Sequence, residues 1–304
     1  MKISVCLCTY KRAFLRNTLE SLACQILPVD TTLEVIVVDN DQEKTAEKII
    51  DDISRDYPFD IKYFSEPEKN IATARNKSIE MATGEWLAFI DDDEEADSNW
   101  ISQLLNTAKK YQADFVQGPV IPIYPKSTPT WIKEGDYFGR RNLVTGTEID
   151  CGAAGNGLLY SQWVKDGLRF NKEFGLTGGG EDGDFFIRLY KKGGRLIWSN
   201  EANVLETVEN NRLNEKYLTK RALRIGETFI KVRKPYMKLK EKLAFFLITL
   251  LKLFLFSVLA VLLLPTGKAN YFKYYLKLVD CFGKIRSSLS IEPVEIYRIK
   301  SHDD

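Results

Sequence analysis

Apolar residues in the first 120 positions of the chain alternate between two spacings. Short runs rich in β-branched residues, typical of strands, alternate with segments whose apolar residues recur every three or four positions, typical of helices. The predicted strands are residues 3–9, 33–39, 61–64 and 86–90, and the predicted helices are residues 14–24, 43–55, 72–82 and 100–111. This alternation is typical of βαβ units, so the sequence predicts an α/β domain with a mainly parallel sheet flanked by helices.

The pattern loosens after this region. Residues 114–150 are rich in proline and predict an irregular segment that runs over the surface. Regular structure is expected again at residues 155–160, then in a helix at 181–192, a strand at 195–198 and an amphipathic helix at 213–232. The helix at 181–192 is expected to stop at the pair of glycines that follows it.

The composition changes towards the end of the sequence. Residues 243–264 are apolar except for Lys252, and a helix of this length spans about 33 Å, near the thickness of a bilayer's hydrocarbon core. Basic residues stand on both sides, so the positive-inside rule selects no orientation. Two arrangements remain open: one transmembrane helix, or a re-entrant or in-plane hairpin in which residues 266–285 form an amphipathic partner at the interface. Both predict membrane association.

Charge and rare residues exclude several kinds of function. Lys plus Arg number 43 and Asp plus Glu 42, a balance that argues against a nucleic-acid binder acting through bulk positive charge. The single histidine, His302, is near the end of the sequence, which argues against a histidine-containing triad and a histidine-ligated metal. Irregularly spaced cysteines and the early charges at the N-terminus predict a reducing, cytoplasmic environment. Chemistry must therefore depend on carboxylates, hydroxyls, thiols, Lys, Arg or oxygen-ligated metals.

Five consecutive acids follow the predicted strand at residues 86–90, running from Asp91 to Glu95. Ligands of open parallel sheets bind outside the carboxyl ends of the strands. Because crowded carboxylates repel one another, we expect a hard divalent cation here, Mg²⁺ or Mn²⁺, of the kind that bridges nucleotide phosphates. The alternative is a solvated acidic loop that caps the next helix.

Two other strand ends carry candidate groups. The first strand ends in Thr9, Tyr10, Lys11 and Arg12, and the second ends in Asp39. An aspartate at this position can accept a hydrogen bond from a base or ribose, or it can cap the following helix. Near the start of the predicted helix at 72–82, Arg75 can face a nucleotide or remain a solvated arginine.

Several of these segments together resemble one enzyme family. VCLCTYKR, VIVVDN, NIATARN and GEWLAFIDDDE, in this order and spacing, resemble glycosyltransferase family 2, whose fold is the GT-A fold, and the resemblance extends to GGGEDGDFFIRLYKKG. It covers about residues 1–200. The segment ANVLETVENNRL, followed by a basic helix, is similar to the subgroup that builds bacterial succinoglycan and related exopolysaccharides. The resemblance implies a GT-A domain, placed at residues 1–225, and the composition predicts a basic, hydrophobic, helical membrane-associated region at residues 226–304.

The resemblance also implies roles for the strand-end residues. Those expected to line the nucleotide pocket are Thr9, Tyr10, Arg12, Asp39 and Arg75. Among them, Asp39 would bond the base, usually uracil, and Arg75 would help to hold the base or ribose.

The acids after the fourth strand match the family's D-x-D motif. Asp91 would face the ribose side and Asp93 would ligate the metal on the diphosphate, as the resemblance implies. The intervening residue, Asp92, is also acidic and would share either role.

The family's ED motif matches Glu181 and Asp182. The resemblance implies that one of them is the catalytic base; Asp182 is favoured, with Glu181 as the alternative. Inverting transfer needs an acceptor hydroxyl that loses its proton as it attacks, and a carboxylate at a helix start is ionised at neutral pH. The alternative is that both are only acids of a first helical turn.

The sequence thus predicts a metal-dependent, inverting glycosyltransferase of bacterial exopolysaccharide or surface polysaccharide synthesis. It would move a sugar from a nucleotide-diphosphate sugar, a UDP-sugar, to a polyprenyl-diphosphate-linked saccharide at the cytoplasmic face of the bacterial inner membrane. Trp131 could stack on the acceptor sugar, although aromatic residues often pack instead. Two other functions remain open: a nucleotidyltransferase, which would not account for the ED motif, and a membrane-anchored scaffold with a degenerate site.

Overall fold

The computed structural model describes residues 1–175 and 179–290. The chain forms two compact units. The first comprises Met1–Pro122, Arg140–Leu176 and Glu181–Thr207; the second comprises Ile123–Gly139, Thr177–Gly180 and Val208–Asp304.

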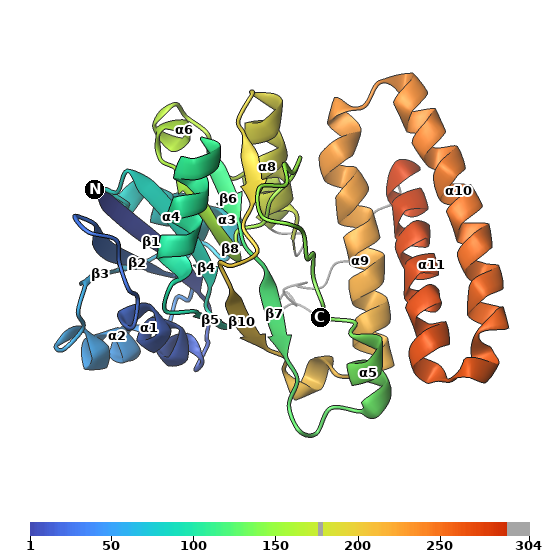
Figure 1. The fold of residues 1–304 in the computed structure, drawn as a ribbon, viewed down its shortest axis with the longest axis horizontal. Coiled ribbons are helices and arrows are strands. Elements are labelled where there is room, and N and C mark those ends of the chain that lie inside the picture. Colours follow the sequence, from blue (N-terminus) through green and yellow to red (C-terminus); the bar gives the residue numbers. More distant parts are fainter. Residues whose placement is uncertain (176–178, 291–304) are drawn as a thin grey trace, which may run out of the picture. The chain divides into compact units, whose positions relative to one another are not determined.

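The first unit is built on a seven-stranded sheet with the order β3-β2-β1-β4-β8-β6-β9 (Figure 1). Four neighbouring strands are parallel: β3 (Asp60–Ser65), β2 (Thr32–Asp39), β1 (Lys2–Thr9) and β4 (Trp86–Asp91). The next strand, β8 (Asn156–Tyr160), is antiparallel to both β4 and β6 (Phe115–Gln117), and β9 (Leu196–Trp198) runs parallel to β6. The carboxyl ends of β1, β2 and β4 therefore lie together at one edge.

Helices cover both faces of this sheet because its central strands are apolar on both sides. They are α1 (Leu15–Ala23), α2 (Glu47–Ser54), α3 (Ile71–Met81), α4 (Trp100–Tyr111), α6 (Gln162–Lys165), α7 (Lys172–Gly175) and α8 (Glu181–Lys191). Val5 of β1 belongs to a core with Leu19 of α1 and Leu104 of α4. Its neighbour Cys6 points to the other face, into a core with Phe89 and with Phe185 of α8.

The sequence prediction for residues 114–150 is wrong in part. Residues 114–150 are not wholly irregular, because they contain β6, β7 (Val120–Ile123) and α5 (Thr130–Gly135). β7 completes a small second sheet with the order β5-β10-β7, in which β5 is Glu94–Ala96 and β10 is Val204–Thr207. These strands have three or four residues, too few to show an alternating pattern in the sequence.

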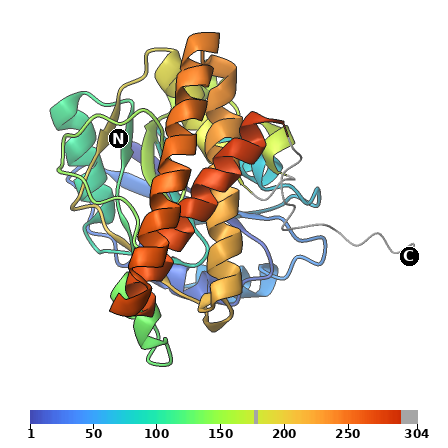
Figure 2. The same ribbon diagram turned by 90° about the vertical axis from the view of Figure 1, so that its right-hand side faces the viewer.

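The second unit contains three long helices: α9 (Glu215–Arg233), α10 (Leu239–Leu262) and α11 (Lys268–Ser288). Short 3₁₀ turns lie at Asn210–Arg212, Lys234–Tyr236 and Leu264–Thr266. Figures 1 and 2 show α10 and α11 as a hairpin in which α11 packs between α9 and α10. Within the described residues, α10 alone is long and apolar enough to cross a membrane, judged by length and composition.

Two glycines set the distance between α9 and α11. A Cβ atom at Gly226 would lie 2.1 Å from the backbone oxygen of Asp280, and one at Gly283 would lie 2.3 Å from that of Leu223. No side chain fits at such a contact. The helices therefore pack backbone to backbone here, and the buried Glu227 accepts a 3.0 Å hydrogen bond from Nε of Arg286 beside the crossing.

A buried carboxylate on β2 stabilises the edge of the large sheet. Glu34 is fully buried; its Oε2 lies 2.7 Å from Nζ of Lys2 and 2.8 Å from Nζ of Lys62, and its Oε1 accepts hydrogen bonds from Ser4 and the Thr83 amide. Burial alone would raise the pKa of Glu34, but these hydrogen bonds together outweigh it and hold the pKa below its usual range.

We expect Glu34→Gln to lower the free energy of unfolding at pH 7 by about 1–3 kcal/mol, the cost of leaving buried hydrogen-bonding groups poorly paired. Because the pKa is depressed in the folded state, this contribution is present above the ordinary pKa of glutamate and is lost as the pH falls below it. Urea unfolding at pH 7 and at pH 3 to 4 measures both effects. Glu43→Gln, in an exposed pair with Lys11, is the control and should change little; equal effects of the two variants would contradict the prediction.

Candidate functional site

The carboxyl ends of β1 and β4 join two of the predicted motifs. The Thr9 hydroxyl donates a 2.7 Å hydrogen bond to Oδ2 of Asp92, which also accepts one from the Tyr10 amide at 3.3 Å. Arg12 spans the next two acids: its Nε lies 3.5 Å from Oδ1 of Asp92 and its Nη2 lies 3.2 Å from Oδ2 of Asp93. The structure thus places the end of the first strand directly against the D-x-D motif.

Arg75 connects the D-x-D motif to the ED motif. It lies on α3, whose N-terminus is capped by the Asn70 side chain accepting from the Ala72 amide. Its Nη2 lies 3.1 Å from Oδ1 of Asp91, and its Nη1 donates to Oε1 of Glu181 at the start of α8. A single buried guanidinium therefore holds together two acids that are far apart in the sequence.

Burial raises the pKa of several acids in this cluster. It is the largest cause for Asp92, whose pKa rises to about 7 against the opposing hydrogen bond from Thr9. It also raises the pKa of Glu181 to about 7, although the charge of Arg75 acts in the opposite direction. Burial, reinforced by the charge of Asp91, raises the pKa of Glu94 well above its usual range. Such shifts indicate a cluster that has too little positive charge for its carboxylates.

Glu94 and Arg140 belong to this cluster, although no sequence motif predicted an individual role for either residue. Glu94 is fully buried, and its Oε2 accepts a 3.0 Å hydrogen bond from the Asp91 amide, which fixes the turn that carries the D-x-D motif. Nη1 of Arg140 lies 3.9 Å from Oε1 of Glu94, and its Nη2 pairs with Glu206. Gly155 lies against the same carboxyls, because a Cβ atom there would be 3.0 Å from Oδ2 of Asp91. Glu94 is the fourth acid of the run from Asp91 to Glu95, and only its complete burial in the fold distinguishes it from the other four.

Asp39 is fully buried at the end of β2. Its Oδ1 accepts a 3.0 Å hydrogen bond from the Asp41 amide, and its Oδ2 accepts from the Ala46 amide at 2.9 Å and from the Tyr63 hydroxyl at 3.1 Å. The N-cap position of α2 is Ala46, so Asp39 orders the loop before this helix from a distance. Base binding by Asp39 stays a prediction.

The two acids of the ED motif differ in their surroundings. Glu181 is buried and paired with Arg75, whereas Asp182 is half-buried and its Oδ1 accepts a 2.7 Å hydrogen bond from the Gly183 amide. The preceding Gly179 and Gly180 have φ angles of 133° and 106°, a region that strongly favours glycine. Gly178, the first glycine of the triplet, lies outside the described residues.

The acids of the cluster outnumber its arginines, which fits a divalent cation. Arg12, Arg75 and Arg140 face seven carboxyl groups, those of Asp91, Asp92, Asp93, Glu94, Glu181, Asp182 and Glu206. No group of three or more potential ligands is assembled for a metal among the residues that the structure describes. Mg²⁺ needs only one or two protein carboxylates when phosphates and water complete its shell. A site that takes its metal together with a diphosphate is therefore compatible with this geometry.

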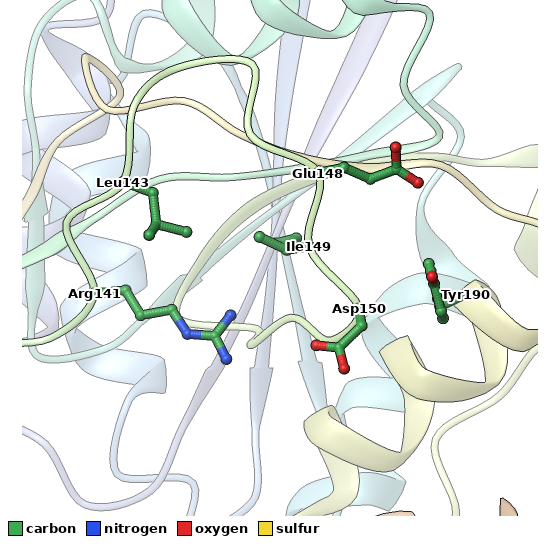
Figure 3. A pocket seen from close by; sticks show the side chains of 6 residues that line it. All are labelled: Arg141, Leu143, Glu148, Ile149, Asp150 and Tyr190. Atoms are coloured by element: carbon green, nitrogen blue, oxygen red, sulfur yellow. The ribbon is translucent and has the colours of Figure 1, made fainter.

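Two further features lie outside the cluster. A surface pocket of about 480 Å³ is lined by residues of the segment 141–150 and by Tyr190 of α8, and no predicted site residue lines it (Figure 3). In the second unit, Trp131 packs against Phe272 and Tyr137 with ring centroids 5.0 and 5.7 Å away, and Nζ of Lys268 lies 4.3 Å from its ring centroid. An acceptor role for Trp131 stays a prediction.

Known proteins share this sequence pattern and fold. A model of the family described as Glycosyl transferase family 2 matches residues 4–168. Succinoglycan biosynthesis protein ExoM of Rhizobium meliloti is 39% identical over 229 residues, 75% of this chain and 74% of that protein. Glucosyl-dolichyl phosphate glucuronosyltransferase of Haloferax volcanii is 26% identical over 225 residues, 67% of this chain and 68% of that protein. The crystal structure of S. aureus TarS 1-349 in complex with UDP-GlcNAc has a TM-score of 0.57 at 16% identity, covers 95% of this chain and 91% of that chain, and confirms the predicted GT-A fold.

Proposed function

The chain belongs to glycosyltransferase family 2, and from this premise we propose that it moves a sugar from a UDP-sugar to a polyprenyl-diphosphate-linked saccharide with inversion at the anomeric carbon. The observation that carries the proposal is the bridge made by Arg75, which joins Asp91 of the D-x-D motif to Glu181 of the ED motif. Nucleotide-side and acceptor-side acids therefore belong to one cluster.

The nucleotide would lie at the ends of β1, β2 and β4. Tyr10 is 41% exposed, and Nζ of Lys69 lies 4.8 Å from its ring centroid, so an aromatic face and a cation are available to a base and a phosphate. Thr9 and Arg12 fix the acids of the D-x-D motif by the contacts described above. Asp93, helped by Asp91 or Asp92, would hold Mg²⁺ or Mn²⁺. When bound, this ion stabilises the negative charge of the departing diphosphate.

Asp182 would accept the proton of the acceptor hydroxyl. It is more exposed than Glu181, whose Oε1 is engaged by Arg75, so an incoming hydroxyl reaches Asp182 more easily. The N-terminus of α8 favours the ionised form of an acid in its first turn. Glu181 then acts as a positioning residue that anchors the start of α8 through Arg75.

A lipid-linked acceptor agrees with two independent features. The Haloferax volcanii relative is named for a glucosyl-dolichyl phosphate, which is a sugar carried on a lipid phosphate. The second unit of this chain exposes a long apolar helix, α10. An acceptor confined to a membrane is met more often by an enzyme attached to the same membrane. We infer that the enzyme works at the cytoplasmic face of the bacterial inner membrane in exopolysaccharide or surface polysaccharide synthesis.

A donor screen tests the proposal. The melting temperature is measured with a panel of nucleotide sugars, with and without Mn²⁺ or Mg²⁺, because a bound donor stabilises the fold by mass action. We expect one UDP-sugar to raise it in a metal-dependent way and to release UDP slowly without acceptor. Stabilisation by none of the nucleotide sugars would support a degenerate scaffold. Formation of a nucleotide sugar from a sugar phosphate and a nucleoside triphosphate would identify a nucleotidyltransferase.

Arg75→Lys is expected to lower the turnover of donor hydrolysis by about 10- to 100-fold. Lysine keeps the charge but cannot contact Asp91 and Glu181 from two nitrogens of one rigid fork, so one charge-assisted hydrogen bond of about 1.5–3 kcal/mol is lost. Arg16→Lys is the matched control, since Arg16 forms an exposed pair with Asp52. Equal rates for the two variants would show that the bridge is not needed for the chemistry.

A further inference from the structure

One side of α10 is an apolar stripe open to the surroundings. Leu243, Leu247, Leu251, Phe254, Val258 and Val261 follow one another at helical spacing and are between 39% and 70% exposed. Thr249 is the one buried residue of this fully described helix. An exposed apolar stripe of about five turns is far larger than a soluble surface normally carries.

The opposite side of α10 packs within the second unit. Phe245 stacks on Phe229 of α9 with ring centroids 5.9 Å apart, and Phe256 lies 6.2 Å from Tyr274 of α11. Nζ of Lys277, also on α11, lies 5.5 Å from the ring centroid of Phe256. α10 is therefore not a detached anchor, because α11 packs along one side, where Phe245 also reaches α9, and the apolar stripe lies on the other.

The charged side chains of α11 bear on whether α10 crosses the membrane or lies at its surface. α11 runs back along α10 (Figure 2) and carries Lys277, Asp280 and Lys284 in and just beyond its middle, the last two joined at 2.5 Å. If α10 crossed the membrane, these side chains would lie at the depth of the hydrocarbon core. Charged side chains at that depth are strongly disfavoured. α11 cannot readily move away, because the glycine contact with α9 and the Arg286–Glu227 pair hold it.

The basic residues around the stripe are placed for a lipid surface. Lys240 is exposed near the start of α10, and Lys252 lies on the helix edge between the stripe and α11. Lys273 is exposed on α11. Long basic side chains at such an edge can keep their stems in the apolar layer and their ammonium groups among anionic headgroups.

We propose that α10 lies in the plane of one membrane leaflet, with its apolar stripe among the acyl chains of anionic phospholipids and with α9 and α11 on the headgroup side. The helix would then attach the chain to the bilayer without crossing it. This inference rests on the proposed function, because attachment to a membrane serves an enzyme whose acceptor is confined there. The in-plane arrangement itself depends only on the second unit.

Vesicle binding by the full chain tests the surface. Sedimentation with vesicles of phosphatidylcholine, with and without 30% phosphatidylglycerol (about one anionic lipid in three), should show binding that is strengthened by the anionic lipid and weakened by salt. The double variant Leu251→Asp, Phe254→Asp should bind at least tenfold more weakly, with unchanged donor hydrolysis. The control Val29→Asp, at a 90% exposed position outside α10, should bind like the wild type. A wild-type chain that ignores vesicles and forms a dimer broken by the double variant would overturn the proposal and assign the stripe to a second copy.

A labelling experiment separates an in-plane helix from a crossing one. Thr266→Cys places a thiol in the exposed turn between α10 and α11, and the native Cys24 is an exposed reference in the first unit. In membrane vesicles of known orientation, a membrane-impermeant maleimide should label both positions from the same side. Labelling from opposite sides would show that α10 crosses and would overturn the proposal. Absence of donor hydrolysis in a Thr266→Cys chain that still labels in this way would count against the proposed function and not against the in-plane arrangement.

Discussion

Asp182→Asn is expected to lower the turnover of sugar transfer by about 10²–10⁴-fold while donor affinity stays near that of the wild type. The fall is the usual effect of removing a positioned general base, because the acceptor hydroxyl then attacks without losing its proton to the enzyme. Donor affinity should persist because the proposed nucleotide contacts lie at the ends of β1, β2 and β4. Turnover with acceptor and the donor dissociation constant, measured on the same preparation, check both parts.

Two further variants decide between the acids of α8. Asp184→Asn is the matched control, because Asp184 lies one turn into the same helix and pairs with Arg188 at 2.8 Å; we expect a small effect on turnover. If Glu181→Gln gives the large loss and Asp182→Asn does not, the roles are reversed. The pKa of Glu181 is raised to about 7 by burial, so a Glu181 base would give a rate that rises with pH through about 7. This rise of the rate with pH would then be absent in Glu181→Gln.

The long apolar runs of the first unit made its architecture readable from sequence. β1 and β2 are buried along nearly their whole length, so their composition reports a strand covered on both faces. β5, β6 and β10 have three or four residues, and such short strands form because longer neighbours hold them in register. β8 is antiparallel to β4, a reversal that depends on where the preceding loop returns the chain and not on local pattern.

The site could be predicted only as far as its residues end strands or open helices. The acids from Asp91 to Asp93 and the pair at Glu181 stand at such positions. Burial and long-range pairing are not visible in a sequence, and they distinguish Glu94 from its acidic neighbours and give Arg75 its two partners. In the same way, the apolar segment left two membrane arrangements open. Its sequence does not show that α11 packs along α10, or that glycine contacts hold α11 against α9.

The D-x-D motif should be the most sensitive part of the site. We expect Asp93→Ala to abolish transfer and to remove the metal-dependent rise in melting temperature that the UDP-sugar gives, while the fold stays intact. The carboxylate of Asp93 is the group that the family resemblance assigns to the metal, and its removal leaves the diphosphate without its counter-ion. In the structure it is only half-buried and pairs with Arg12, so we expect its loss to leave the fold intact.

Metal titration distinguishes this role from a simple charge effect. Glu95→Gln is the control, because Glu95 belongs to the same acidic run but lies within β5, and it should keep its metal response. At a donor concentration of about 100 times the dissociation constant, the wild type gains about 2.7 kcal/mol from binding; in Asp93→Ala this gain should be small and equal with Mn²⁺ or EDTA. Full transfer activity of the wild type in EDTA would contradict the metal assignment, because charge on the leaving diphosphate would then be stabilised by Arg12 and its neighbours alone.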